Sequence, residues 1–416
     1  MSEFHYANGQ LCAERVALNK VAERFATPAY VYSRAAIESQ WHAYDDALAE
    51  RQHLICYAVK ANSNLAVLSL LAELGSGFDI VSVGELERVL KAGGDPSKIV
   101  FSGVGKRTDE IKRALDVKIK CFNVESLSEL SRLDQIAAEK NLIAKVSLRI
   151  NPDVDAETHP YISTGLKETK FGIAYDRALE SYIQARDMTN IDVVGIDVHI
   201  GSQLTDLEPF RLAYKKVAEL TKMLRQDGHN IRRLDLGGGL GIPYENSNQS
   251  PPTPEDYAKV IHETVGDLDC EIEIEPGRLL AGNAGLMVSS VIYNKSGEGR
   301  DFMIVDAAMN DLIRPAMYEA YHEIIPVIES TGSSEIKDYD IVGPVCETGD
   351  ILAKGWKSKK LQAGDLLAIR SAGAYGASMS SQYNTRPLIA EILVDGKDFK
   401  TIRRSPTYDE MLSLEE

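Results

Sequence analysis

Short runs of apolar, largely β-branched residues alternate along the chain with longer segments whose apolar residues recur at helical spacing, such as Leu65, Leu68 and Leu71. A strand that is covered on both faces has a continuous apolar pattern of this kind. Strands that alternate with helices over roughly 250 residues are typical of a (β/α)8 barrel. The sequence therefore predicts an α/β fold with a TIM-like barrel, whose strands we place at Leu54–Val59, Gly77–Val81, Lys98–Ser102, Ile119–Val124, Ala144–Ile150, Val193–Ile200, Arg232–Leu236 and Glu271–Glu275.

After Gly282 the pattern changes to alternating apolar and polar residues without long helical segments. The earlier run Ala29–Tyr32 is expected to join these later strands, because chain termini often lie close together. We therefore expect a barrel domain over residues 35–282 and a second, all-β domain, sandwich-like or barrel-like, over residues 1–34 and 283–416. The strands of the second domain are predicted at Leu286–Tyr293, Phe302–Val305, Leu366–Arg370 and Pro387–Val394.

The chain of 416 residues carries 62 acidic and 46 basic side chains, which gives a net charge of −16. Nucleic-acid binding requires a clustered Lys and Arg surface, so this balance argues against a nucleic-acid partner and favours a small-molecule ligand. The sequence has no run of about 18 uncharged apolar residues, and its N-terminus has no basic segment followed by an apolar run. We therefore expect a cytoplasmic protein without membrane spans.

The five cysteines stand singly in the sequence, with no pair at the spacing of a metal site or a redox motif. Disulfide frameworks are also rare inside cells. We therefore expect neither a disulfide bond nor a metal site from Cys12, Cys56, Cys121, Cys270 and Cys346.

Polar residues follow the predicted barrel strands directly, at the end of the barrel where such enzymes assemble their sites. Lys60 ends the first strand and Asp79 lies at the end of the second. Burial inside a barrel mouth would favour the neutral amine of Lys60, which can condense with an aldehyde. The alternative for an isolated lysine is a side chain that extends out of the barrel into water.

A glycine-rich segment, Gly237–Gly239, follows the seventh predicted strand, and Glu275-Pro276-Gly277-Arg278 follows the eighth. Backbone N–H groups without side chains can approach an anion closely, and barrels commonly bind phosphate after these two strands. A glycine run taken alone is more often a tight turn. Its place after the seventh strand favours a phosphate site here.

Glu275 and His199 are candidates for contacts with an aromatic cofactor. A carboxylate paired with a pyridinium nitrogen keeps that nitrogen protonated and makes the ring a strong electron sink. The imidazole of His199 could stack on such a ring, and the hydroxyl of Ser202 could reach its phosphate. The alternatives are an ion pair between Glu275 and Arg278, and a purely structural His199.

Taken together, these segments resemble the fold-type III pyridoxal-phosphate decarboxylases, and most closely the diaminopimelate decarboxylase family. The resemblance extends over nearly the whole chain and includes Lys170-Phe171-Gly172 and Ser102–Lys106. It implies an alanine-racemase-like fold and the conversion of meso-2,6-diaminopimelate into L-lysine and CO2, the last step of lysine biosynthesis. The other segments that carry the resemblance are Tyr57–Asn64, His199–Gln203, Asp235–Gly241, Glu275–Arg278, Gly343–Asp350 and Ala374–Tyr375.

The resemblance also implies which residues bind the cofactor, pyridoxal 5'-phosphate. Lys60 would carry it covalently, His199 would stack on its ring and Glu275 would pair with its ring nitrogen. The full cofactor-binding set that we expect is Lys60, Asp79, His199, Ser202, Gly238, Gly239, Glu275, Gly277, Arg278 and Tyr375.

For the amino-acid substrate, the resemblance implies that Arg278, Arg314, Tyr318 and Tyr375 contribute to binding, with carboxylate contacts from the two arginines and Tyr318. Glu347 would bind the distal amino group. Cys346 would donate the proton that replaces CO2, although a free cysteine is more often a small buried hydrophobic side chain. The family further implies a homodimer in which two subunits share each active site.

Two other functions stay open at this level. An ornithine or arginine decarboxylase has the same fold and cofactor, but such enzymes carry aspartate after the cysteine, where this chain has Glu347. Their substrates also lack the distal carboxylate for which the segment Arg314–Tyr318 is suited. A non-catalytic regulatory homologue is the other alternative, and the presence of Lys60, Glu275 and Cys346 argues against it.

Overall fold

The computed structural model describes residues 3–155, 164–165, 169–244, 251–329 and 335–415. It divides into two compact units. The barrel unit contains Gln40–Ile242 and Ser250–Leu279, and the β unit contains Met1–Ser39, Pro243–Gln249 and Leu280–Glu416. The domain limits predicted from the sequence stay a prediction.

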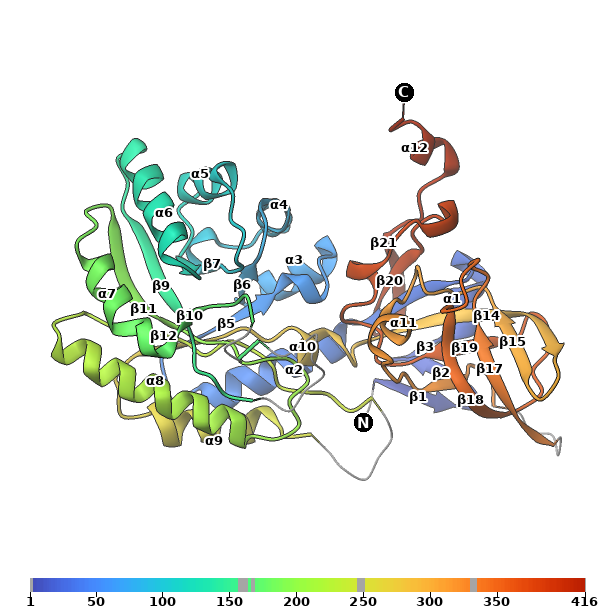
Figure 1. Cartoon of the computed structure of the whole chain (residues 1–416). Coiled ribbons are helices and arrows are strands. Elements are labelled where there is room, and N and C mark those ends of the chain that lie inside the picture. The colour runs from blue at the N-terminus through green and yellow to red at the C-terminus, as the bar shows by residue number, and fades with distance from the viewer. Residues whose placement is uncertain (1–2, 156–163, 166–168, 245–250, 330–334, 416) are drawn as a thin grey trace. The chain divides into compact units, whose positions relative to one another are not determined.

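Eight parallel strands close the barrel, which confirms the predicted fold class (Figure 1). Closure is completed by pairing of the fourth barrel strand with the fifth and of the eighth with the first. In chain order the strands are β5 (His53–Ala58), β6 (Gly77–Ile80), β7 (Ile99–Phe101), β8 (Cys121–Val124), β9 (Ala144–Asn151), β11 (Ile191–Asp197), β12 (Arg233–Asp235) and β13 (Glu271–Ile274). The short strand β10 (Ile173–Ala174) pairs with the end of β9.

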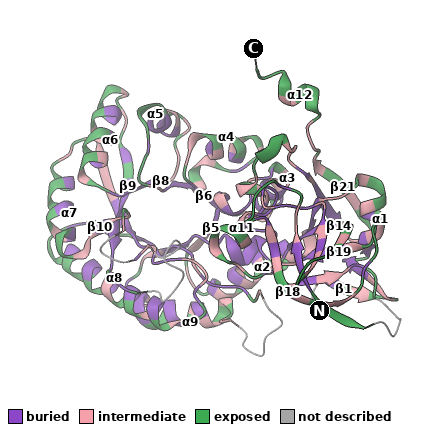
Figure 2. Cartoon of the chain, turned by 45° about the vertical axis from the view of Figure 1, so that its right-hand side comes forward, coloured by how far each residue is buried: buried purple, intermediate pink, exposed green. Residues whose placement is uncertain are grey.

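Helices surround the barrel strands, and the longer ones bury one face each. In α8, for example, Phe210, Tyr214 and Val217 are buried at helical spacing. The strands are buried, whereas the outward faces of the helices are exposed (Figure 2). The helices are α2 (Arg34–Leu48), α3 (Leu65–Glu73), α4 (Val83–Lys91), α5 (Thr108–Asp116), α6 (Leu127–Glu139), α7 (Ala178–Arg186), α8 (Glu208–Gln226), α9 (Pro254–Val265) and α10 (Arg278–Ala281).

Serine side chains cap the first turn of two of the helices that follow barrel strands. The side chains of Ser82 and Ser126 accept hydrogen bonds from the backbone N–H groups of Glu85 and Glu129, at the starts of α4 and α6. Each such cap contributes about 1 kcal/mol to helix stability. The caps fix where the loops end and therefore which residues face the barrel mouth.

The end of the sixth barrel strand differs most from the prediction. The sequence pattern extends to Ile200, but β11 ends at Asp197. Beyond it, the backbone N–H of Val198 donates to the carbonyl of Asp235, and the ring of His199 accepts from the backbone N–H of Gly238. The apolar pattern continues because these residues are still packed inside the barrel mouth, although the strand ladder has ended.

The barrel interior contains a buried layer of charges. Arg233 of β12 donates to the carboxylates of Glu273 and, at 3.4 Å, Asp235. The amine of Lys120, just before β8, lies 3.2 Å from Glu273. Buried charges are tolerated when they are paired and hydrogen-bonded, and these residues form a connected polar layer inside the barrel.

The β unit is mostly sheet. Its larger sheet has the strand order β18-β17-β15-β14-β4-β20-β21, and β19 pairs with β14 and β16. A separate meander is formed by β1, β2 and β3. The strands are β1 (Phe4–Ala7), β2 (Gln10–Ala13), β3 (Val16–Ala17), β4 (Ala29–Ser33), β14 (Gly285–Ser296), β15 (Asp301–Val305), β16 (Ile324–Pro326), β17 (Ile336–Val342), β18 (Ile351–Lys359), β19 (Leu366–Ile369), β20 (Ala390–Asp395) and β21 (Asp398–Arg403).

The strand β4 lies within this sheet and is buried on both faces. It pairs antiparallel with β14 and parallel with β20. Tyr30 and Tyr32 pack into one apolar cluster of the unit, whereas Ala29 and Val31 pack into another. The short helices of the unit are α1 (Leu18–Phe25), α11 (Arg314–Tyr318) and α12 (Tyr408–Leu412).

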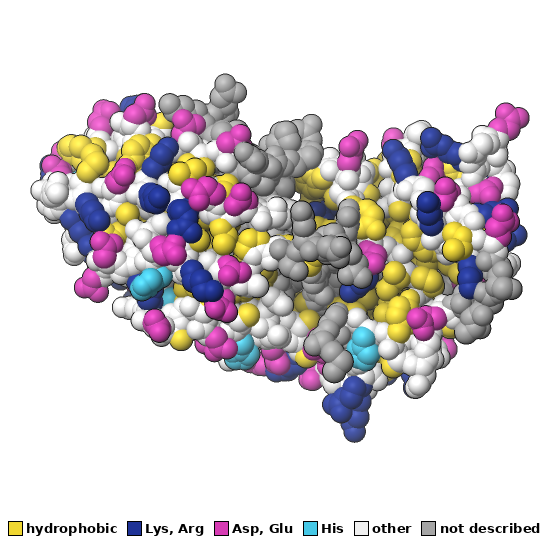
Figure 3. Space-filling view, turned by 90° about the horizontal axis from the view of Figure 1, so that it is seen from below, with side chains coloured by type: hydrophobic (Ala, Val, Ile, Leu, Met, Phe, Trp, Pro, Cys, Tyr) yellow, Lys and Arg dark blue, Asp and Glu magenta, His cyan; other side chains and the backbone are white. Residues whose placement is uncertain are grey.

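Among the described residues, every helix is too short or too polar to cross a membrane. The face shown in Figure 3 carries Lys and Arg side chains interspersed with Asp and Glu. All five cysteines are free thiols.

Candidate active site

Lys60 lies in the 3-10 turn η1 (Val59–Ala61), directly after the first barrel strand. Its amine donates to Oδ2 of Asp79 on the neighbouring strand β6, at 2.6 Å. Asp79 is fully buried, and the side chain of Lys60 is 38% exposed. The amine is therefore held at the barrel mouth by a buried carboxylate and does not extend away into water, but it is less buried than the sequence suggested.

The glycine-rich segment after β12 has no room for side chains. A Cβ atom at Gly237 would lie 2.5 Å from the carbonyl oxygen of Val198. Gly239 has a φ of +119°, and a Cβ there would lie 2.5 Å from the carbonyl oxygen of Gly201. At Gly238 a Cβ would collide with the backbone of Glu275. The backbone of the segment thus lies directly against the loops after β11 and β13, where only glycine fits, and we call this segment the glycine cradle.

Polar side chains flank this cradle. The guanidinium of Arg278 donates to the hydroxyl of Ser202 through Nε at 3.3 Å and Nη2 at 3.1 Å. Gly277, just before α10, is buried. The guanidinium of Arg278 and the hydroxyl of Ser202 therefore connect the loops after β11 and β13. Both groups can donate hydrogen bonds to a phosphate or a carboxylate.

His199 is a neutral imidazole in this arrangement. Its Nδ1 accepts a hydrogen bond from the backbone N–H of Gly238 at 3.2 Å. Removal of water from the ring, together with the positive charges of Arg149 and Lys60, holds its pKa well below the usual value. A neutral, fixed ring is suited to stacking on a flat ligand.

Glu275 is buried within a group of carboxylates. Its Oε1 accepts from the hydroxyl of Ser102 at 3.2 Å and from Nδ2 of Asn123 at 3.3 Å. Oxygen atoms of Asp197, Asp235 and Glu275 lie within 4.8 Å of one another. Burial, and then the negative charges of Asp235, Asp79 and Asp197, raise the pKa of Glu275 well above its usual range.

This carboxylate group has a hydrogen-bond donor inside it. Nδ2 of Asn123 donates to both Glu275 and, at 3.0 Å, Asp235, while Arg233 donates to Asp235. Amide and guanidinium donors therefore reach two of the three carboxylates, Asp235 and Glu275. The partners of Glu275 also argue against the alternative of an ion pair with Arg278, whose guanidinium donates to Ser202.

Sequence reasoning missed two residues that organise the site, Asn123 and Arg149. Arg149 donates to Glu125 at 2.9 Å, and Glu125 also accepts from the backbone N–H groups of Gly103 and Gly172. Both missed residues lie inside apolar barrel strands. A polar side chain in a strand that is covered on both faces is a signal that could have identified them.

The remaining predicted site residues lie in the β unit. Arg314 begins α11 and is buried, and Tyr318 ends that helix. Tyr375 has a left-handed backbone conformation, with φ of +57°. Such strain in a non-glycine residue persists only where the surrounding structure holds it, and it is often found at functional sites.

Cys346 and Glu347 lie in a loop of the same unit, between β17 and β18. The backbone N–H of Cys346 donates to Oδ1 of Asn384 at 2.9 Å, and Oε2 of Glu347 accepts from the hydroxyl of Tyr383 at 3.1 Å. Cys346 is exposed. The alternative interpretation of Cys346 as a small buried hydrophobic side chain is therefore wrong.

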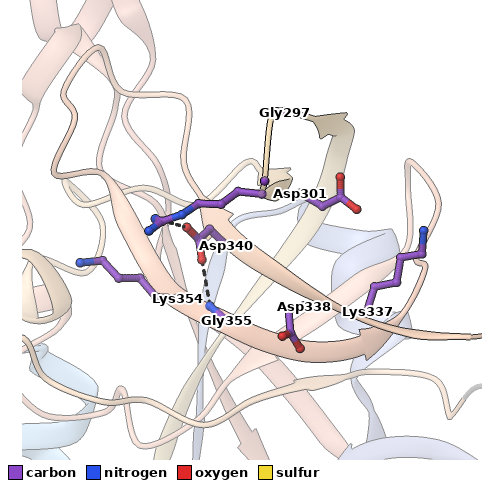
Figure 4. Close-up of a pocket in the computed structure, with 9 residues that line it drawn as sticks. Gly297, Asp301, Lys337, Asp338, Asp340, Lys354 and Gly355 are labelled. Atoms are coloured by element: carbon purple, nitrogen blue, oxygen red, sulfur yellow. Dashed lines mark hydrogen bonds and ion pairs between the residues drawn. The ribbon is translucent and has the colours of Figure 1, made fainter.

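A separate hollow of ≈ 710 Å³ in the β unit is lined by charges of both signs (Figure 4). Arg300 donates to Oδ2 of Asp340 at 3.2 Å, and the backbone N–H of Gly355 donates to Oδ1 of the same side chain. These opposite charges satisfy one another locally. The hollow contains none of the predicted site residues and does not change the assignment of the site.

Comparison with known proteins identifies the family. Residues 34–282 match the model of the pyridoxal-dependent decarboxylase, pyridoxal binding domain. The chain is 56% identical over 417 residues to diaminopimelate decarboxylase of Vibrio cholerae serotype O1, covering 100% of this chain and 99% of that protein. The chain belongs to the diaminopimelate decarboxylase family.

Solved structures of the diaminopimelate decarboxylase family have the same fold as this chain. The enzyme of Helicobacter pylori, crystallised with L-lysine, matches with a TM-score of 0.91 and 44% identity over 95% of this chain and 98% of that one. The enzyme of M. jannaschii, also in complex with L-lysine, matches with a TM-score of 0.94 and 37% identity over 99% and 97% of the two chains. As a member of this family, the chain is a pyridoxal-phosphate-dependent decarboxylase.

Proposed function

We propose that this chain decarboxylates meso-2,6-diaminopimelate to L-lysine and CO2. The observation that carries the proposal is the meeting, at one end of the barrel, of the Lys60 amine, the Gly237–Gly239 cradle and the buried acid Glu275. An amine, an anion cradle and a proton-holding carboxylate are the three groups needed to bind a phosphorylated aldehyde with a pyridine ring.

The residues present fit pyridoxal 5'-phosphate. When bound, this cofactor supplies an aldehyde and an electron-accepting ring. Lys60 would attach it covalently while Asp79 orients the amine, His199 would stack on the ring and Glu275 would hold the proton at the ring nitrogen. Its phosphate would be bound by backbone N–H groups and side chains of Ser202, Gly238, Gly239, Gly277, Arg278 and Tyr375.

The substrate would be oriented by its charged ends. Arg278, Arg314 and Tyr318 are suited to carboxylate groups, with help from Tyr375, because guanidinium and phenol groups donate hydrogen bonds to carboxylate oxygens. Glu347 would bind the distal amino group. The thiol of Cys346 would deliver a proton from Sγ to the α-carbon after CO2 leaves, as its exposure allows.

The direct test is an assay of the purified protein with meso-diaminopimelate, ornithine, arginine and lysine. Turnover of meso-diaminopimelate well above the other three is expected. Faster turnover of ornithine or arginine would support the rival decarboxylase. Bound cofactor should give an absorbance band near the visible edge that borohydride reduction removes. If the protein has no such band, it is a non-catalytic homologue.

Glu275→Gln should lower turnover by about 10²-fold, the size of effect seen when one stabilising active-site contact is removed. A neutral amide cannot hold the ring nitrogen protonated, whereas the hydrogen bonds from Ser102 and Asn123 can still be accepted. The measurement is kcat at saturating cofactor. Glu139→Gln makes the same chemical change on the exposed surface of α6 and should leave kcat unchanged. Undiminished turnover in Glu275→Gln would show that the pairing is wrong.

Glu347→Asp should reduce kcat/KM for meso-diaminopimelate by about tenfold or more, since a site built around a polar contact discriminates strongly when that contact is lost. The shorter side chain would also lose its hydrogen bond from Tyr383. Steady-state kinetics on the purified variant provide the measurement. If the variant equals the parent, Glu347 is not the specificity residue.

We also propose a homodimer in which each active site combines Lys60 of one subunit with Cys346 of the other. Two features support it: the two residues lie in different units of the chain, and Cys346 is exposed in the isolated chain. A two-fold interface makes two equivalent sites. The predicted cytoplasmic location is part of the same proposal and is supported by the five free thiols.

A further inference from the structure

Asn123 is a fully buried amide of β8 that lies among three other groups of the site. Its Nδ2 atom is 3.0 Å from Oδ2 of Asp235, 3.2 Å from Oγ of Ser102 and 3.3 Å from Oε1 of Glu275. Asp235 ends β12, whereas Ser102 and Glu275 directly follow β7 and β13. One amide therefore connects three other strands of the barrel.

The surroundings of Asp235 fix which end of this amide points toward it. Oδ1 of Asp235 accepts from the backbone N–H of Gly237 at 3.2 Å, and Oδ2 accepts from Nη2 of Arg233 at 3.4 Å. Because both oxygens are acceptors, the atom of Asn123 that lies beside Oδ2 must be a donor. Reversing the amide would place two acceptor oxygens in contact. The orientation with Nδ2 toward Asp235 is therefore the one that the contacts allow.

The carbonyl oxygen of the same amide makes no such contact. Oδ1 of Asn123 is buried and has no hydrogen-bond partner among the residues that the structure describes. A buried polar atom without a partner destabilises the folded state, so its presence calls for an explanation. We find that explanation in the other end of the amide, which donates to the site.

Two donors converge on one oxygen of Glu275. Oε1 accepts from Nδ2 of Asn123 at 3.3 Å and from the hydroxyl of Ser102 at 3.2 Å. Because Oε1 already accepts two hydrogen bonds, a proton that this carboxyl group holds belongs on Oε2. Donors at Oε1 also stabilise the negative charge that remains when the proton leaves Oε2.

Negative neighbours oppose that ionisation. Burial raises the pKa of Glu275, and the charges of Asp235, Asp79 and Asp197 raise it further. The positive charge of Lys60 lowers it, but by less than any of these effects. Hydrogen bonds to a carboxylate favour its charged form, so the donors at Oε1 act against the repulsion from the neighbouring acids.

We propose that Asn123 is a positioning residue that stabilises Glu275 as a carboxylate, so that the proton of Oε2 moves to the nitrogen of the cofactor ring. The inference rests on the proposed function, in which Glu275 pairs with that nitrogen. In this transfer Glu275 loses the hydrogen of Oε2 and becomes negative, while the ring nitrogen gains that hydrogen and a positive charge. Without the amide donor the proton should stay on Glu275, which leaves a neutral ring that accepts electrons less well.

Three variants separate the donor from the shape of the side chain. Asn123→Leu keeps a side chain branched at Cγ but has no donor. Ser102→Ala removes the other donor at Oε1 and leaves Asn123 in place. The matched control is Asn190→Leu, which makes the same change directly before β11, where Nδ2 donates to Oδ1 of Asp134 at 3.1 Å.

The experiment loads each protein with pyridoxal 5'-phosphate that carries an NMR-active isotope at the ring nitrogen. The nitrogen chemical shift distinguishes a protonated from a neutral ring, and the cofactor Kd and kcat are measured on the same samples. We expect a protonated nitrogen in the parent and in Asn190→Leu. Asn123→Leu should shift the signal toward the neutral form and lower kcat about tenfold or more, as expected for a lost hydrogen bond to a charged group. Ser102→Ala should shift the signal in the same direction, but less.

A nitrogen in Asn123→Leu that is as fully protonated as in the parent would overturn the inference. A weakened cofactor Kd in that variant would then indicate a purely structural role. The inference also fails if Asn190→Leu shifts the signal as far as Asn123→Leu does, because the effect would then come from a general loss of stability. If Asn123→Leu binds no cofactor, Ser102→Ala decides: a shift toward the neutral form supports the inference, and an unchanged signal overturns it.

Glu275→Gln separates this inference from the proposed function, because it should give a neutral ring nitrogen. If it does so while Asn123→Leu stays protonated, the pairing with Glu275 stands and the inference fails. If the nitrogen stays protonated in Glu275→Gln, the pairing itself is wrong and the inference fails with it. A parent that shows the expected shifts but does not turn over meso-diaminopimelate would overturn the substrate assignment alone.

Discussion

Lys60→Ala should lower turnover by about 10⁴-fold or more, the scale of loss when a covalently acting side chain is removed from an enzyme. Alanine has no amine to attach the cofactor, and the protein places this one amine 2.6 Å from the buried carboxylate of Asp79. The variant should also lack the absorbance band of attached cofactor. Turnover and absorbance at saturating cofactor are the measurements.

Two further variants show whether the loss is chemical or structural. Lys60→Arg keeps a cation for Asp79 but stays protonated and cannot attach the cofactor, so it should be as inactive as Lys60→Ala while retaining more thermal stability. Lys91→Ala removes an exposed lysine at the end of α4 and should be fully active. Cofactor trapped by borohydride on any lysine other than Lys60 would refute the assignment.

Mixing Lys60→Ala chains with Cys346→Ala chains should restore about a quarter of the parental activity from two nearly inactive parents. In a dimer with shared sites, a mixed pair has one site with both residues intact and one site that lacks both. Random reassortment makes half of the dimers mixed. The measurement is activity after dissociation and reassociation, with mixed dimers counted by mass spectrometry.

The matched control for this experiment is a mixture of Lys60→Ala and Lys60→Arg chains, in which no pairing can supply the missing lysine. It should regain nothing. If mixed dimers of Lys60→Ala and Cys346→Ala form but remain inactive, each active site is built within a single chain, and the proposed sharing of sites is excluded.

The barrel could be predicted from the sequence because its strands are covered on both faces. Such strands give continuous apolar runs, and all eight predicted runs overlap a barrel strand. The end of β11 could not be predicted, because Val198 remains buried after its strand partners have ended. An apolar sequence pattern indicates which residues are buried, and here buried residues continue beyond the last hydrogen-bonded residue of the strand.

Site residues could be predicted from the sequence where their position directly after a strand identifies them. Contacts between residues on different strands could not, because they depend on how the strands are aligned with one another. Lys60 and Gly237–Gly239 are recognisable from their place after a strand. The contacts of Asn123 with Asp235 and Glu275 join residues on three strands, and they depend on how those strands are staggered around the barrel.

The buried charge layer of the barrel limits which substitutions could give this enzyme a new substrate preference. Removing either Arg233 or Glu273 would break a buried ion pair, at a cost of about 3–5 kcal/mol. That is a large part of the stability of a typical domain. A single substitution in this layer should therefore unfold the protein and should not yield an enzyme with altered chemistry. Exposed positions such as Glu347 carry no such penalty, so new substrate preferences should evolve, or be engineered, in the β unit while the barrel interior stays fixed.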